Sequence, residues 1–324
     1  MNVLKKIYGF FYRRIRLAKL LNLEKEYLVR YNGSFETDND AVKLENKIRI
    51  SVHGIEKGFS YRSPKPAFGI DKILGLLSML KHYKTLPEAS EAFVKDCLAT
   101  IKYYIDTYKG NEKIEPIVKD YEALAASVGG CIEAKDAILN INKSDVDTIL
   151  GSINYEEFIA SRHSYRFYAK TPVDKELLKK ALKIAEHTPT ACNRQAQKVY
   201  VFTGEEKDKL LNIGPSRGFV TEVDTAILIT VDMRAYFSDE FYQCYVDGGL
   251  YAMNLINAIH STGLGCIPLT AGMFAVNQRK ELCERFNIPQ NEAPIITIGI
   301  GNREEKAQVN ASYRKSYKEY TIFS

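Results

Sequence analysis

The stretch SRHSYRFYAKTPVD, residues 161–174, places two arginines, a histidine and a serine close together. Guanidinium groups can hold a phosphate through charge-assisted, bidentate hydrogen bonds, and a neighbouring hydroxyl can add another. A solvated basic turn would have the same composition. Taken alone, Arg162, Ser164 and Arg166 therefore predict either an anion site or an exposed charged surface.

A second polar stretch, HTPTACNRQAQ at residues 187–197, follows an amphipathic helical pattern over Glu176–His187. Thr190, Asn193 and Gln195 supply uncharged hydrogen-bond donors and acceptors, which suit the edge of a heteroaromatic ring. A polar turn between a helix and a strand would contain the same residues, so both interpretations stay open on this stretch alone.

Two glycine-containing stretches lie further along the chain. In STGLGCIPLTAGMF, residues 261–274, the glycines allow close backbone approach and the proline would free N–H groups for a ligand. A helix C-cap followed by a short strand is the alternative, because a helical pattern over Phe241–Thr262 ends at Gly263. IITIGIGNREEK, residues 295–306, is not a dinucleotide fingerprint, because Glu304 stands where GxGxxG requires its third glycine. Arg303 and Arg314 are interpreted as further phosphate contacts or surface charge.

In order and spacing, these four stretches resemble the FMN-dependent nitroreductase-like flavoproteins, from about Phe158 to about Lys315. Residues 162–167 are similar to the family's basic-Ser-x-basic-aromatic opening. Residues 188–195 resemble its (A/S)P(S/T)xxNxQPW turn, although Ala-Gln replaces the final Pro-Trp. The GLG at 263–265 and the apolar run before Gly301 are similar to the family's later segments.

The resemblance implies an α+β fold, a nitroreductase-like α/β/α sandwich, and an intertwined homodimer with FMN at the subunit interface. The phosphate would be held by the basic opening and a late arginine, and the ring or ribityl chain by the polar turn. A backbone N–H after the GLG segment would face the flavin N5. The expected cofactor-binding residues are Arg162, His163, Ser164, Arg166, Pro189, Thr190, Ala191, Asn193, Gln195, Leu269, Thr270 and Arg314.

The implied activity is that of an FMN-dependent NAD(P)H oxidoreductase, because flavin carries the electrons and the protein tunes and positions it. NAD(P)H would reduce the flavin, and a small organic or glycan-linked acceptor would then be reduced by a ping-pong mechanism. No catalytic side chain is assigned. A non-catalytic flavin-binding scaffold in a membrane-associated polysaccharide assembly and a flavin-free anion-binding protein are the alternatives. The acceptor and the choice between NADH and NADPH stay open.

Composition argues against a nucleic-acid-binding protein, a zinc protein and a disulfide-stabilised protein. The chain has 324 residues, which predicts about two domains. Its net charge of +5 is too small to indicate nucleic-acid binding. Six cysteines without a CxxC pair indicate neither zinc nor a disulfide framework, and favour a reducing cytoplasm. We therefore expect no metal site and no nucleic-acid partner.

The N-terminal half is expected to be mainly helical, with a basic amphipathic helix over 1–21, a helical region over 22–150 and the flavin-binding domain over 151–324. The first helix carries six basic residues and no acidic ones, so it predicts either packing on its own domain or contact with an anionic membrane surface. Similar extensions, by resemblance, accompany bacterial polysaccharide-biosynthesis proteins.

The stretch HGIEKGFSYRSPKPAFG, residues 53–69, is the most suggestive part of this helical region. Gly58 is placed to end the helix that begins before Leu44. His53, Glu56 and Lys57 lie on adjacent turns before a loop with Tyr61 and Arg62. We expect the loop to cover the flavin and select the substrate; a helix cap followed by a solvated linker is the alternative.

Overall fold

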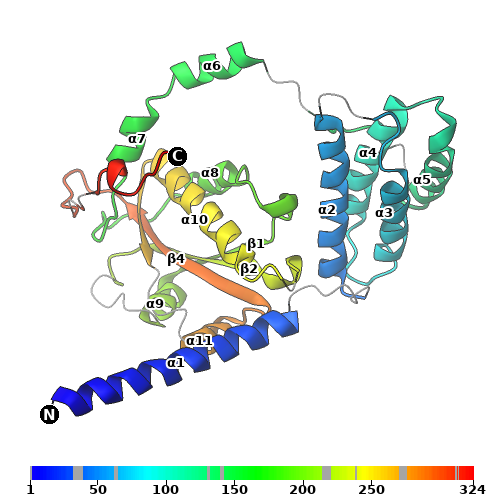
Figure 1. The fold of residues 1–324 in the computed structure, drawn as a ribbon. Helices are drawn as coiled ribbons and strands as arrows, with labels where there is room; N and C mark the ends of the chain where they lie inside the picture. Colours follow the sequence, from blue (N-terminus) through cyan, green and yellow to red (C-terminus); the bar gives the residue numbers. More distant parts are fainter. Residues whose placement is uncertain are drawn as a thin grey trace.

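The computed structural model describes residues 2–31, 39–61, 65–129, 132–138, 142–213, 220–237, 239–269, 276–310, 312 and 314–324. Helices α2 to α5 pack together in one part of the molecule. A sheet with helices on its faces makes up the other part (Figure 1). Arg62 and Thr270 lie outside the described residues.

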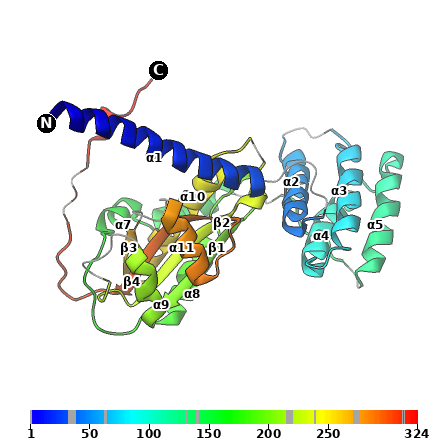
Figure 2. The same ribbon diagram turned by 90° about the horizontal axis from the view of Figure 1, so that it is seen from below.

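The helical part contains α2 (Ala41–Ser60), α3 (Ile70–Tyr83), α4 (Glu91–Thr107), η1 (Glu112–Ile114) and α5 (Glu115–Ser127). Asp40 begins α2, since its side chain accepts hydrogen bonds from the Val42 and Lys43 N–H groups, each at 3.0 Å. Apolar residues at helical spacing meet in a core of their own, which includes Ile48, Leu77 and Tyr104. Figure 2 shows these helices beside one another. These helices lie within residues 22–150, the region expected to be mainly helical.

Gly58 does not end its helix, so that expectation was wrong. Helix α2 continues through Gly58 to Ser60. A Cβ atom added at Gly58 would lie 2.0 Å from Cε2 of Phe68. The glycine therefore lets the Phe68 ring approach the helix backbone. In the sequence, a glycine required by this tertiary contact cannot be told from one that ends a helix.

The sheet has four antiparallel strands in the order β1-β2-β4-β3, namely β1 (Gln197–Thr203), β2 (Thr225–Asp232), β3 (Leu264–Leu269) and β4 (Glu292–Asn302). Successive residues of β2 enter different cores: Ile227 and Ile229 belong to one cluster, and Ala226 and Leu228 to another. This alternation follows from the two-residue period of a strand. Both faces of the sheet are consequently buried.

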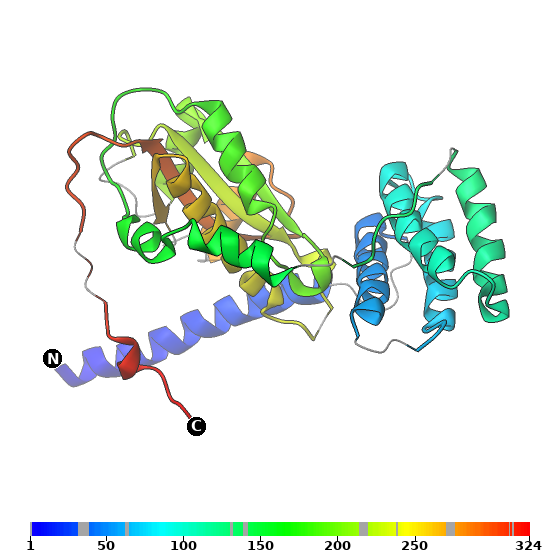
Figure 3. The same ribbon diagram turned by 90° about the horizontal axis from the view of Figure 1, so that it is seen from above.

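Helices cover both faces. α8 (Lys175–Ala185) and α10 (Gln243–Ser261) contribute to the first cluster, and α9 (Gly204–Ile213) and α11 (Val276–Phe286) to the second. Figures 1 and 3 show this layering around the sheet. The expected α+β class with α/β/α layers is confirmed. The end of α10 also agrees, because Gly263 follows it with a φ of 88°.

Helix α1 (Asn2–Tyr31) continues beyond residue 21 and docks by its C-terminal part. Glu24 accepts a hydrogen bond from the Tyr245 hydroxyl at 2.6 Å and pairs with Arg279 at 3.4 Å. The Arg279 guanidinium also lies 3.7 Å from the centre of the Tyr27 ring. Phe10 and Ile15, nearer the N-terminus, are exposed, and Figure 1 shows this end projecting away from the sheet.

Two short helices, α6 (Lys143–Gly151) and α7 (Tyr155–Ser161), connect the helical part to the basic stretch. Short 3-10 turns lie at η2 (Ala191–Asn193), η3 (Met233–Ala235) and η4 (Tyr317–Glu319). Within the described ranges, no helix has both the length and the apolar character that crossing a membrane requires.

Candidate functional site

The basic stretch is fixed against β3 and the end of β4. The Tyr165 N–H donates to the Cys266 carbonyl at 3.1 Å, and the Ala169 N–H donates to the Asn302 carbonyl at 2.9 Å. Tyr168 is buried over the sheet, where a Cβ at Gly301 would lie 2.5 Å from its ring. The glycine thus makes room for the aromatic side chain that anchors this stretch.

Arg162, His163, Ser164 and Arg166 come together there, half-buried. The Arg166 Nη1 donates to Oδ1 of Asn310 at 3.1 Å. Among the acidic residues that the structure describes, none forms an ion pair with Arg162 or Arg166. Two cations without acidic partners leave positive charge available for an anion, which fits the predicted phosphate site.

Arg303 has a structural role, contrary to the expected phosphate contact or surface charge. Its Nη2 donates to the carbonyls of His260 at 2.8 Å and Leu264 at 3.0 Å. It also approaches Nδ1 of His260 at 2.9 Å. Because a guanidinium has no acceptor, Nδ1 must accept this bond. Arg303 therefore holds the end of α10 against the start of β3.

His260 is held as a neutral ring. Its Nε2 lies 2.8 Å from Ser161 Oγ and donates to it, since Nδ1 already accepts from Arg303. Burial lowers the pKa of His260, and the nearby charges of Arg303 and Arg162 lower it further. The histidine thus links α7 to α10 beneath the basic stretch without adding positive charge.

The polar turn has an unusual backbone. Cys192, Asn193 and Gln195 have φ values of 50°, 55° and 53°. Three residues with side chains in the left-handed region are uncommon in so short a segment, and such conformations persist only where surrounding contacts enforce them. The Thr190 side chain contributes one of these contacts, because its Oγ1 accepts the Gln195 N–H at 3.1 Å.

Asp247 on α10 holds the start of this turn. Its buried carboxylate accepts from the Ala191 N–H at 3.1 Å and from the Tyr236 hydroxyl at 2.9 Å. Gln243 donates to the other oxygen at 2.8 Å. Burial and the adjacent Asp247 raise the pKa of Tyr236, so the phenol stays protonated and continues to donate.

A buried ion pair holds the end of the turn. Arg194 donates to both oxygens of Glu240, at 2.7 and 2.8 Å, and its side chain is 2% exposed. Burial acts to raise the pKa of Glu240, but the hydrogen bonds from Arg194 and the Phe237 N–H outweigh it and lower that pKa. The carboxylate is therefore ionised at neutral pH and anchors the turn through Arg194.

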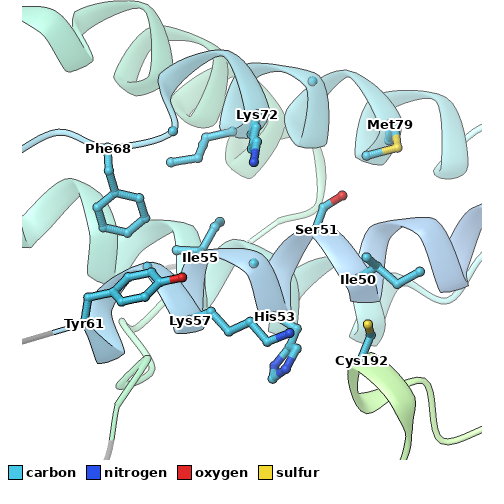
Figure 4. A pocket seen from close by; sticks show the side chains of 15 residues that line it. Ile50, Ser51, His53, Ile55, Lys57, Tyr61, Phe68, Lys72, Met79 and Cys192 are labelled. Carbon is cyan, nitrogen blue, oxygen red and sulfur yellow. The ribbon is translucent and has the colours of Figure 1, made fainter. Parts of the chain in front are cut away.

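The turn faces the helical part. Asn193 and Gln195 line a small cavity of about 120 Å³ together with His53 and Glu56 of α2. Nδ1 of His53 and Oε2 of Glu56 are 3.0 Å apart. Cys192 borders a larger cavity between α2 and α3, shown in Figure 4. The N-terminal helices thus contribute side chains beside the predicted flavin turn.

The basic stretch and the polar turn lie at opposite corners of the sheet. β4 provides a common scale for the two segments. Gln197, just after the turn, pairs with Val231 of β2, which pairs with Ala293 of β4. Cys266, which lies beside Ser164, pairs with Ile300 of β4. Seven residues of β4 separate these levels, which is about 23 Å along the strand. The two segments also lie on opposite edge strands. One chain therefore does not bring both halves of the predicted site together.

The remaining predicted residues are scattered. Leu269 ends β3 and packs beside the second cluster, and Arg314 is exposed in the C-terminal segment. Pro189, Thr190, Ala191, Asn193 and Gln195 all belong to the polar turn. Sequence reasoning missed the supporting residues Asp247, Glu240 and Arg194. Only Arg194 had a local signal, because it stands inside the turn motif.

Comparison with known proteins places a family match over the same stretch. Residues 159–214 match the model of the nitroreductase family, and this range includes both the basic stretch and the polar turn. A curated protein of Pseudomonas sp. (strain G-1), described as a Cr(VI) reductase, is 26% identical over 170 residues. The match spans 47% of this chain and 69% of that protein.

Solved structures also align with about half of the chain. A nitroreductase family protein from Streptococcus pneumoniae TIGR4 is 19% identical, with a TM-score of 0.46, over 53% of this chain and 100% of that one. An FMN-dependent nitroreductase from Clostridium difficile R20291 is 24% identical, with a TM-score of 0.43, over 52% and 98%.

Proposed function

We propose that this protein is an FMN-dependent oxidoreductase that receives electrons from NAD(P)H and passes them to a small organic or glycan-linked acceptor. The family match over residues 159–214 carries the proposal, because it covers the basic stretch and the polar turn in one segment. The relative described as a Cr(VI) reductase is a redox protein by name, which supports the same reaction class.

Two groups of residues suit two parts of FMN: the basic stretch suits its phosphate, and the polar turn suits its ring or ribityl chain. Arg162 and Arg166, without acidic partners among the described residues, supply charge for a phosphate, with the Ser164 hydroxyl between them. Asn193 and Gln195 lie on a turn whose shape is enforced by buried contacts, so their amides are preorganised. Bound FMN would supply the electron transfer chemistry. These side chains would bind and orient it and hold nearby positive charge.

We propose further that two copies complete each site, as a homodimer. The separation of the two halves across the sheet supports this, because a cofactor contacting both needs one half from each copy. Helix α10 offers a surface for the second copy: Tyr242, Val246, Leu250 and Met253 are exposed at helical spacing, each at least 46%.

Flavin content tests the proposal. The purified protein is expected to show oxidised-flavin absorption, to release FMN on denaturation and to bleach under anaerobic NAD(P)H. Exchanging Arg162 and Arg166 together for Gln should lower FMN content about tenfold, since charge-assisted phosphate contacts are lost. Lys175→Gln/Lys180→Gln, which removes the same charge from exposed positions on α8, is the matched control and should retain FMN. A colourless protein that does not take up added FMN would overturn the proposal.

Mixing variants tests the shared site. Arg166→Gln and Asn193→Ala proteins should each bind FMN poorly, for different reasons. In a mixed dimer one of the two sites combines both intact halves, so unfolding and refolding the two together should restore part of the FMN content. No restoration would contradict a site shared between two copies. If FMN binds but NAD(P)H does not reduce it, a non-catalytic flavin scaffold is the function instead.

A further inference from the structure

A cavity of about 980 Å³ lies between α2, α3 and the turn that carries Cys192 (Figure 4). Sites for small organic molecules typically have volumes of about 300–1,000 Å³. The cavity is therefore large enough for an organic ligand well beyond the size of an inorganic ion.

Glycines help to keep this space open. Gly54 on α2 and Gly75 on α3 both border the cavity, and a Cβ added at either would meet nothing within 4 Å. Glycine inside a helix costs about 1 kcal/mol relative to alanine. Two such positions on facing helices keep side chains out of a space that ordinary helix packing would fill.

The walls are mainly apolar. Ile50, Ile55 and Ile73 line the cavity, and Phe68 closes one end, where Figure 4 shows its ring between the two helices. Phe68 is itself fixed by edge-on contact with Phe59 at a centroid distance of 5.1 Å. These walls suit an apolar or aromatic body.

The charged groups at the cavity are all potential cations. Lys57 and Lys72 border it from opposite helices: in Figure 4 the Lys72 ammonium lies beside α3, and the Lys57 side chain extends along α2 toward His53. Neither ammonium forms an ion pair or hydrogen bond with the residues that the structure describes. The described lining contains no carboxylate, since Glu56 lies on the side of the smaller cavity. A ligand that carries negative charge would neutralise this excess.

We propose that this cavity binds an organic anion with an apolar or aromatic body, its acidic group between Lys57 and Lys72. The binding follows from the cavity alone. The assignment of this cavity as the substrate site rests on the proposed function. Cys192, on the predicted flavin turn, lines the cavity, so a bound ligand would lie beside that turn. The ligand class would then be that of the acceptor or of an effector of its reduction.

Two fluorescent probes with the same aromatic body test the charge preference in the full-length protein as purified. 8-Anilino-1-naphthalenesulfonate carries the anion, and N-phenyl-1-naphthylamine lacks it. We expect the sulfonate to bind about tenfold more tightly, which is the effect of one favourable charged contact. In a Lys57→Gln/Lys72→Gln variant the two probes should bind alike. Lys109→Gln/Lys113→Gln removes equal charge from exposed positions outside the cavity and should keep the preference.

Volume is tested separately. Gly75→Leu should exclude both probes, whereas Gly75→Ala should reduce their affinity by no more than about threefold, because a methyl group occupies little of the cavity. A Phe11→Ser/Ile15→Ser variant removes exposed apolar side chains from the projecting end of α1, a competing place for such probes. Circular dichroism establishes that each variant folds.

The outcomes distinguish the possibilities. Loss of the sulfonate preference in the lysine variant and of both probes in Gly75→Leu, with binding retained in the α1 variant, supports the site. Loss only in the α1 variant, or equal affinity of the two probes for the unaltered protein, overturns it. Because binding is measured irrespective of flavin content, a failure here is separate from absence of FMN, which would overturn the proposed function instead.

Discussion

Cys192, Asn193 and Gln195 adopt left-handed backbone conformations that side chains disfavour. Each such conformation costs about 1–3 kcal/mol when it is held against its preference. The carboxylates of Asp247 and Glu240 offset this cost, one through the Ala191 N–H and the other through Arg194. The amides of Asn193 and Gln195 are consequently set in place before any ligand arrives.

Glu240→Gln is expected to destabilise the protein by about 3 kcal/mol, because it leaves the buried Arg194 guanidinium without a countercharge. Urea unfolding at pH 7 measures the change. Glu222→Gln is the matched control, since Glu222 pairs with Lys170, whose side chain is 69% exposed, and should cost less than about 1 kcal/mol. Equal effects of the two substitutions would contradict the anchoring role of the Arg194–Glu240 pair.

His260 predicts a pH dependence of stability. Its folded pKa lies below the ordinary value of 6.5, so near that pH the unfolded chain binds a proton that the folded chain does not. The stability associated with this group is present in full above pH 6.5 and declines as the pH falls toward the folded pKa. Unfolding free energies at pH 7.5 and 5.5 should therefore differ more in the unaltered protein than in His260→Gln. An identical pH dependence would show that His260 contributes none of it.

At the scale of elements, α2 serves two purposes with two glycines four residues apart. Gly58 admits Phe68 against the backbone, whereas Gly54 faces the open cavity. One helix thus contributes both to the core of the helical part and to the cavity beside the polar turn. Its position against η2 couples the N-terminal region to the predicted flavin site.

Alanine at these two positions should have opposite effects. Gly54→Ala is expected to stabilise the protein by about 1 kcal/mol, because alanine favours the helix and its methyl group meets no neighbour. Gly58→Ala should destabilise it by about 1–3 kcal/mol, since the methyl group overlaps the packed Phe68 ring. Chemical unfolding compares them directly. If both substitutions stabilised the protein, the packing of Phe68 against Gly58 would not contribute to the free energy of unfolding.

At the scale of the whole molecule, α1 docks by its C-terminal part. Glu24, Tyr27 and Tyr31 contact the sheet part, whereas Phe10, Phe11 and Ile15 are exposed on the projecting end. Exposed apolar side chains beside basic ones suit the surface of an anionic membrane. The interpretation of residues 1–21 as a membrane contact therefore stays a prediction, and the docked part begins after it.

A chain lacking residues 1–21 should no longer float with vesicles that contain phosphatidylglycerol, whereas the full chain should. Each basic residue near such a surface contributes about 1 kcal/mol, so neutral vesicles should bind the full chain weakly. The contacts of Glu24 remain in the shortened chain, and its unfolding transition serves as the control for folding. Equal flotation of both chains would end the membrane interpretation.

The sequence alone determined those features that depend on interactions within a few residues. Apolar spacing located the helices of the N-terminal part, and Gly263 marked the end of α10, because helix periodicity and left-handed backbone preference act within a few residues. The basic stretch and the polar turn were recognisable because their donors and acceptors lie within single segments. The fold class followed from the family resemblance that these stretches carry.

Only the tertiary structure determined which residues those segments contact and where they lie relative to one another. Gly58 resembled a helix end but accommodates Phe68, and Arg303 resembled a phosphate contact but binds the carbonyls of His260 and Leu264. Strand register set the polar turn and the basic stretch at opposite corners, and packing brought α2 and Cys192 together around one cavity. Such contacts join residues far apart in the chain, so no local spacing encodes them and only the packed chain fixes them.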